Sequence, residues 1–64
     1  MSRKQRSSMK HFRRYKDSDE VKEVDRKEAI QHLSPYWRDV DFLIDNATQE
    51  KPIWNPVAYY WTEK

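Results

Sequence analysis

The first 16 residues interleave basic and aromatic side chains in a pattern typical of nucleic-acid contact. This segment holds seven cations and no acid, and all eleven acids of the chain lie beyond it. Cations neutralise backbone phosphates, and aromatic rings between them can stack on exposed bases. The alternatives are docking on an acidic protein surface, or a solvated tail. The predicted nucleic-acid-binding residues are Arg3, Lys4, Arg6, Lys10, Phe12, Arg13, Arg14, Tyr15 and Lys16.

Aromatic residues in the second half of the chain predict contact with a protein partner. Tryptophan and tyrosine are enriched at interfaces, and a phenylalanine placed among aspartates is typical of a binding hot spot. The alternative is that the rings complete a core too small to close with aliphatic residues. The predicted protein-binding residues are Phe42, Trp54, Tyr59, Tyr60 and Trp61.

Three aspartates, Asp39, Asp41 and Asp45, have a spacing that could place carboxylates together on a helix. Such a group could hold a divalent cation or form an acidic docking face. A hard cation needs about six oxygen ligands, which three aspartates on one helix rarely supply. A solvated helix face is the simpler interpretation. The sequence therefore predicts no metal ion and no cofactor.

The residues that could support catalysis are few. His32 and Ser34 are close in sequence, but Ser34 is better explained as a helix cap and no third orienting group is evident. Asp41 and Glu50 could pair as acid and base, yet nothing suggests a pocket around them. A chain of 64 residues also has little volume to enclose a substrate. We therefore expect a protein that is not an enzyme.

Composition limits the chain to one small domain. The 64 residues include no cysteine, which removes disulfides, thiolate chemistry and the common zinc sites. They also include no glycine, which excludes glycine-dependent phosphate loops and disfavours tight hairpin turns. An all-β barrel is therefore not expected. No segment has the apolar length of a membrane span or a signal-peptide core, so we predict a cytoplasmic location and no membrane partner.

Two short helices are predicted to form the centre of a mostly α-helical domain. Asp25 and Glu28 have capping-box spacing, which predicts a helix over about residues 26–33. Ser34 and Pro35 suit the start of a second helix, predicted over about residues 35–47. This second segment carries an apolar stripe at helical spacing, the strongest structural signal in the chain. The stripe consists of Tyr36, Trp37, Val40, Leu43, Ile44 and Ala47.

The segments that flank these helices are predicted to be irregular. Residues 1–16 are expected to be a disordered basic arm, because they lack the apolar surface needed to fold alone. Residues 16–24 are expected to form an extended linker. Prolines interrupt the aromatic C-terminal segment, 48–64, and an extended stretch at 57–62 is expected to lack a ladder partner in this chain. We expect the segment either to form a strap across the helices or to add a strand to the sheet edge of another protein. The small helical domain then spans residues 17–64.

These features predict a small non-enzymatic binding protein with two kinds of partner. The basic arm would contact nucleic acid, and the helical body with its aromatic C-terminus would contact a larger protein or complex. The alternative is a protein-interaction module that regulates or inhibits a larger enzyme or assembly, without nucleic-acid contact.

Overall fold

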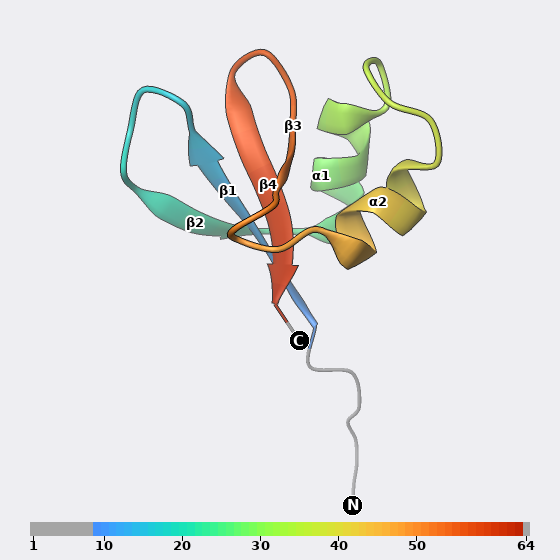
Figure 1. Cartoon of the computed structure of the whole chain (residues 1–64), viewed down its shortest axis with the longest axis horizontal. Coiled ribbons are helices and arrows are strands. Elements are labelled where there is room, and N and C mark those ends of the chain that lie inside the picture. Colours follow the sequence, from blue (N-terminus) through green and yellow to red (C-terminus); the bar gives the residue numbers. More distant parts are fainter. Residues whose placement is uncertain (1–8, 64) are drawn as a thin grey trace, which may run out of the picture.

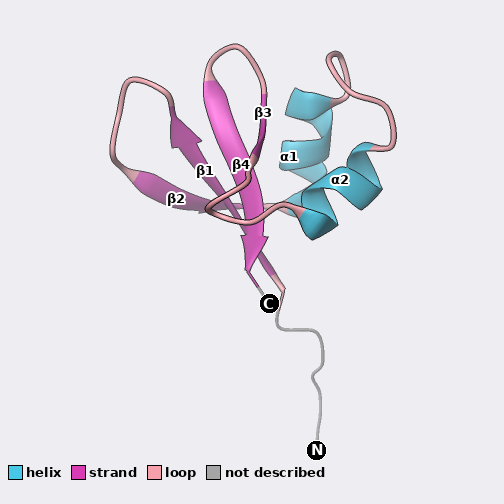
Figure 2. Cartoon of the chain, in the orientation of Figure 1, coloured by secondary structure: helices cyan, strands magenta, loops and turns pink. Residues whose placement is uncertain are grey.

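The computed structural model describes residues 9–63, which form a four-stranded antiparallel sheet with two helices packed beside it (Figure 1). The strands follow the spatial order β2-β1-β4-β3, so β1 and β4 are central. Figure 2 shows both helices on the same side of the sheet. The elements in chain order are β1 (Lys10–Tyr15), β2 (Val21–Val24), α1 (Arg26–Leu33), α2 (Val40–Asn46), β3 (Ile53–Trp54) and β4 (Ala58–Glu63).

Strand register gives the sheet two chemically different faces. His11 lies opposite Thr62 and Arg13 lies opposite Tyr60, whereas Phe12 lies opposite Trp61. Opposite residues in an antiparallel pair share a face, and successive residues alternate between faces. The odd-numbered residues of β1 therefore point toward the helices, on what we call the helix face. The even-numbered residues point the other way, onto the open face.

Most of the hydrophobic core lies between the helix face and the two helices, and Trp61 adds a buried ring on the open face. Leu33 from α1, Ile44 from α2 and Tyr60 from β4 are the largest fully buried side chains. Burial of such apolar surface is the main force that holds short elements together. The buried hydrophobic residues are Ala29, Leu33, Val40, Ile44, Ala47, Ile53, Ala58, Tyr60 and Trp61.

Hydrogen bonds connect α2 to the last strand. The Thr62 hydroxyl donates to the carbonyl of Ile44 at 2.6 Å, and the Thr62 N–H donates to the carbonyl of Ala47 at 3.2 Å. The Ala47 carbonyl lies at the C-terminal end of α2, where helical partners run out, whereas the Ile44 carbonyl also accepts from the Ala47 N–H at 3.3 Å. The end of this short helix is therefore attached to a central strand.

The predicted mostly α-helical fold is wrong, and the description of the protein as a small helical protein is wrong with it. Residues 10–15, expected to lie in a disordered arm, form the central strand β1. The C-terminal stretch was expected to lack a ladder partner, but β4 pairs with both β1 and β3. The six-residue pairing between β1 and β4 was not expected, because these two strands lie at opposite ends of the chain.

The two helices differ in how well local signals predicted them. Helix α1 has the predicted bounds, although the Asp25 side chain makes no capping hydrogen bond. Helix α2 begins at Val40 rather than at Pro35. The backbone N–H groups of Tyr36 and Trp37 donate to the Leu33 carbonyl, which wraps this segment around the end of α1. Asp39 then adopts a left-handed conformation, with φ of 52°, immediately before α2.

Candidate nucleic-acid interface

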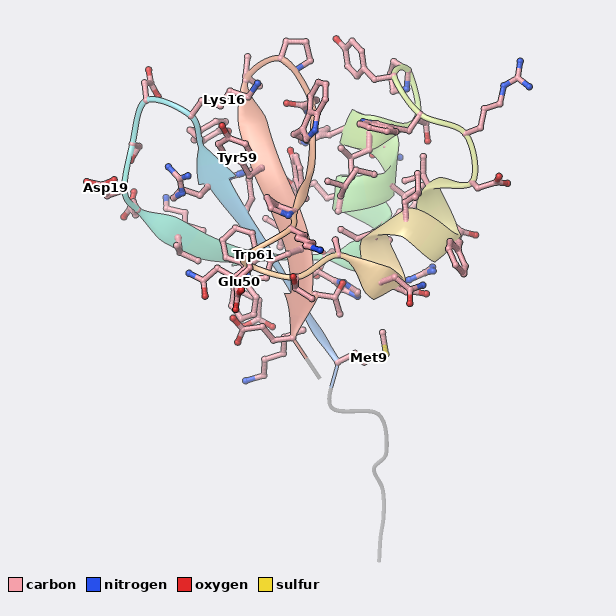
Figure 3. All side chains as sticks on the ribbon, viewed as in Figure 1. Met9, Lys16, Asp19, Glu50, Tyr59 and Trp61 are labelled. Atoms are coloured by element: carbon pink, nitrogen blue, oxygen red, sulfur yellow. The ribbon has the colours of Figure 1, made fainter. Side chains whose placement is uncertain are left out.

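Two cations and two aromatic rings form a cluster at one end of the open face. The Arg14 guanidinium carbon lies 4.9 Å from the centre of the Tyr59 ring. The Lys16 amino group lies 5.2 Å from the Trp54 ring centre and 5.4 Å from that of Tyr59. Figure 3 shows Lys16 and Tyr59 together at the end of the molecule opposite the chain termini. We call Arg14, Lys16, Trp54 and Tyr59 the cationic aromatic cluster.

The pairing of three strands places the members of this cluster together. Tyr59 on β4 lies opposite Arg14 on β1 and opposite Trp54 on β3, so all three residues share the open face. The Lys16 N–H donates to the Val57 carbonyl at 2.9 Å, which continues the pairing of β1 with β4 beyond Tyr15. The cluster therefore depends on cations and rings that are separated by 38 to 45 positions in the sequence.

Contacts from two loops hold the cluster in place. The Arg14 guanidinium donates to the Ser18 carbonyl in the β1–β2 turn at 2.9 Å. The indole N–H of Trp37 donates to the Trp54 carbonyl at 2.6 Å, and the two indole rings pack edge to face with centres 5.2 Å apart. Trp54 still exposes 47% of its surface. Its ring is thus both positioned by the fold and accessible to a ligand.

The cations of the cluster retain their positive charge. Within residues 9–63 the ion pairs are Arg13 with Glu28 and Arg26 with Asp45, so neither Arg14 nor Lys16 faces a carboxylate. A contact between a cation and an aromatic ring is attractive but leaves the charge in place. This end of the open face therefore combines positive charge with ring surfaces.

The remaining predicted nucleic-acid-binding residues are distributed over the fold. Arg13 points to the helix face, where it pairs with Glu28 at 3.0 Å and its guanidinium lies over the Tyr15 ring. Phe12 stacks on Trp61 with ring centres 6.1 Å apart. Lys10 begins β1 opposite Glu63. The predictions for Arg3, Lys4 and Arg6 lie outside the described residues.

The predicted protein-binding residues divide into buried and exposed groups. Tyr60 and Trp61 are 1% and 2% exposed, so they belong to the core. Tyr59 and Trp54 belong to the cationic aromatic cluster. Phe42 is 67% exposed on α2 and remains available to a partner.

Polar groups in the interior serve structural contacts. The Tyr60 hydroxyl lies 2.9 Å from Nδ1 of His32, and burial raises the pKa of this phenol above its ordinary value. Asp45, one of the three aspartates considered as an acidic group, accepts two hydrogen bonds of 3.2 and 3.0 Å from Arg26 and is thereby paired with a cation. No set of three or more metal-ligating side chains gathers in the described part of the chain, residues 9–63.

One sequence signal could have indicated the cluster. Residues 10–16 do not alternate between apolar and polar types, so hydrophobic periodicity did not indicate the strand. The signal is the Asp17–Glu20 segment that follows, which is rich in turn-forming residues. The high charge of residues 10–16 obscured this signal, because it resembled the composition of a disordered arm.

No protein-family model, curated protein or solved structure matches this chain. Among residues 9–63, no helix has the length and apolar character required to cross a membrane.

Proposed function

We propose that this protein is a non-enzymatic, nucleic-acid-associated binding protein of the cytoplasm that contacts single-stranded nucleic acid through the cationic aromatic cluster. The observation that carries the proposal is the position of Arg14 and Lys16, without acidic partners among the described residues, over the rings of Tyr59 and Trp54. The basic segment predicted to bind nucleic acid thus supplies the cations, and the aromatic C-terminal segment supplies the rings.

The chemistry of the cluster suits an unpaired strand better than a duplex. Arg14 and Lys16 can each neutralise a phosphate, and the exposed Trp54 ring offers a surface on which a base can stack. Stacking of one base on an aromatic side chain contributes about 1–3 kcal/mol and tolerates any base. The bases of a duplex are already stacked on each other and present only their edges. We therefore expect binding that prefers single strands and depends little on sequence.

The proposal is tested by the salt dependence of oligonucleotide binding. Fluorescence anisotropy would follow a fluorescein-labelled thymidine oligonucleotide, and a duplex of equal length, titrated with protein at several salt concentrations. Each cation that neutralises a phosphate of a single strand contributes about 0.7 to the slope of log affinity against log salt. The double variant Arg14→Ala/Lys16→Ala should reduce the slope by about 1.4.

A matched control separates this contact from a general effect of charge. Lys27→Ala removes an exposed cation from α1, which lies beside the other face of the sheet, and should leave both affinity and slope nearly unchanged. Trp54→Ala should weaken single-strand binding with the slope retained, because it removes a ring and no charge. The proposal fails if the Arg14→Ala/Lys16→Ala variant and the Lys27→Ala variant bind the oligonucleotide equally well.

A second candidate function, a protein-interaction module that regulates a larger assembly, is favoured by Phe42. This residue is the most exposed of the large hydrophobic side chains in the described chain, and it lines a hollow with Asp39 and Asp41. An exposed ring beside two acids fits a partner surface that is apolar and basic. Phe42→Ala should weaken capture of such a partner in a pull-down that is insensitive to nuclease, whereas an unchanged capture would remove this candidate.

A further inference from the structure

A shallow groove crosses the end of the molecule where three connections meet. The β1–β2 turn, the β3–β4 turn and the α1–α2 connection all lie at the end opposite the C-terminus (Figure 1). The groove consists of two adjoining hollows of about 370 and 590 Å³, which share part of their lining. We call this surface the tyrosine groove, and its apolar residues are Tyr15, Pro35, Tyr36, Pro56 and Val57.

The tyrosine groove gathers large apolar side chains that the fold leaves accessible to solvent. Tyr15 is 44% exposed, Tyr36 is 57% exposed and Val57 is 59% exposed. Exposed apolar groups that lie next to each other, rather than scattered singly, mark interaction sites. Tyrosine suits such a site because it adds a large ring at a low cost in conformational entropy and carries a hydroxyl.

We infer that the tyrosine groove binds an extended, proline-rich segment of a partner protein that carries a lysine or arginine next to its prolines. Such segments adopt the polyproline II conformation without internal hydrogen bonds, and they dock in preformed grooves lined by aromatic side chains. Tyr15, Pro56 and Val57 line both hollows and so form a ridge between them. Two hollows separated by a ridge fit successive apolar groups of one extended chain.

Hydrogen-bond donors at the groove match the free carbonyls of such a segment. The hydroxyl of Tyr36 and the side-chain amide of Gln31 lie at the first hollow. Within the described part of the chain neither side chain makes a hydrogen bond, so both donors are available. The floor is held by the contact between Tyr60 and His32, and by the Asn55 amide, which donates to the His32 carbonyl at 3.2 Å.

The charge at the second hollow favours a basic peptide over nucleic acid. Asp17 lines this hollow, and Asp19 and Glu20 follow it in the same turn; none of the three has an ion pair among residues 9–63. Lys16 also lines the hollow, with its amino group over the rings of Trp54 and Tyr59, but the three carboxylates of the turn outnumber this one cation. Figure 3 shows Asp19 on the outer side of the turn, away from Lys16 and Tyr59. Three unpaired carboxylates repel phosphates and attract lysine or arginine.

Isothermal titration calorimetry with synthetic peptides tests this inference on the full chain. The probe is a peptide of about ten residues with two proline pairs separated by single apolar residues and an arginine at one end. One comparison peptide replaces the prolines with alanine, and a second replaces the arginine with glutamine. We expect a Kd below about 1 mM for the probe and no measurable binding of the alanine peptide.

Three variants locate the binding site. Tyr36 lies in an exposed loop, and Tyr36→Ala should lower the affinity for the probe about tenfold, as expected for a central aromatic contact. The combined Asp17→Asn, Asp19→Asn and Glu20→Gln variant should bind the arginine probe several-fold more weakly than the wild type does. Its affinity for the glutamine peptide should equal that of the wild type. Glu50→Gln is the control and should bind the probe like the wild type, because Glu50 is exposed and lines neither hollow. Circular dichroism would show that each variant remains folded.

The inference stands apart from the proposed nucleic-acid contact, and each can fail without the other. Binding of the probe that Tyr36→Ala weakens and that Arg14→Ala, at a residue lining neither hollow, leaves intact would support it. Absence of binding at about 1 mM peptide would overturn it. Displacement of the bound probe by a thymidine oligonucleotide would also overturn it, because the groove would then belong to nucleic acid.

Discussion

The Nδ1 atom of His11 lies 2.8 Å from the hydroxyl oxygen of Thr62, and both side chains are buried between the sheet and α2. The Thr62 hydroxyl has one proton, which it donates to the Ile44 carbonyl. It therefore accepts a hydrogen bond from His11, and we infer that the imidazole carries its proton on Nδ1. This chain of hydrogen bonds links β1, β4 and α2.

Stability is expected to decrease as the pH falls below about 6.5, because of His11. Burial lowers the pKa of this imidazole, with Asp45 partly opposing the shift. The unfolded chain, in which the pKa has its ordinary value, therefore takes up a proton at a higher pH than the folded chain does. The contribution of neutral His11 is present above about pH 6.5 and is lost as the pH falls toward the folded-state pKa.

Urea unfolding between pH 7.5 and pH 5 measures this dependence. One proton limits the slope to about 1.4 kcal/mol per pH unit. His11→Gln should reduce the slope, whereas His32→Gln, the matched change at an exposed histidine, should retain it. Equal slopes for His11→Gln and the wild type would contradict the assignment.

The ion pair between Arg13 and Glu28 should contribute more to stability than the pair between Arg26 and Asp45. The Arg13 side chain is only 13% exposed, so Glu28→Gln leaves a largely buried guanidinium without its charged partner. We expect a loss of about 1–2 kcal/mol in the free energy of unfolding. Asp45→Asn breaks the more exposed pair and should cost about 0.5 kcal/mol. Chemical denaturation compares the two, and equal losses would contradict this ranking.

The side chain of Asn55 should be essential to the turn between β3 and β4. Its carbonyl oxygen accepts from the N–H groups of Val57 at 2.9 Å and Ala58 at 2.8 Å, and the residue is 5% exposed. Asn55→Ala leaves both donors without this acceptor and should destabilise the fold by about 2–3 kcal/mol. Asn55→Asp loses the donor to His32 and adds a negative charge, but it keeps an acceptor for both N–H groups, which stabilise that charge, so it should cost less. A thermal denaturation series tests this order, which fails if the aspartate variant is the less stable.

Phe42 and Ile44 should respond differently to truncation although they are two residues apart on α2. Ile44 is fully buried, so Ile44→Ala should cost about 2–5 kcal/mol. Phe42 is 67% exposed, and Phe42→Ala should change the free energy of unfolding by less than about 0.5 kcal/mol. A large loss at Phe42 would show that the ring supports the fold rather than remaining available to a partner.

Local signals determined part of this architecture from the sequence. The bounds of α1 follow from the residue pattern between Asp25 and Leu33, because helix formation depends on neighbours three and four positions apart. The buried positions Val40, Ile44 and Ala47 follow from the apolar stripe of the second helical segment. The basic and aromatic residue types of the cationic aromatic cluster are also visible in the sequence as two separate segments.

Only the tertiary structure decided that those two segments form one sheet. Strand β1 pairs with β4 across most of the chain, and Arg14 meets Tyr59 only through that pairing. A strand obtains its hydrogen bonds from another strand, so its partner and register depend on contacts distant in sequence. Composition made residues 10–15 resemble a disordered arm, because the apolar surface that stabilises them is supplied by the helices and by β4. The residue types of the candidate site were thus determined by the sequence, and their shared location by the pairing of the two ends of the chain.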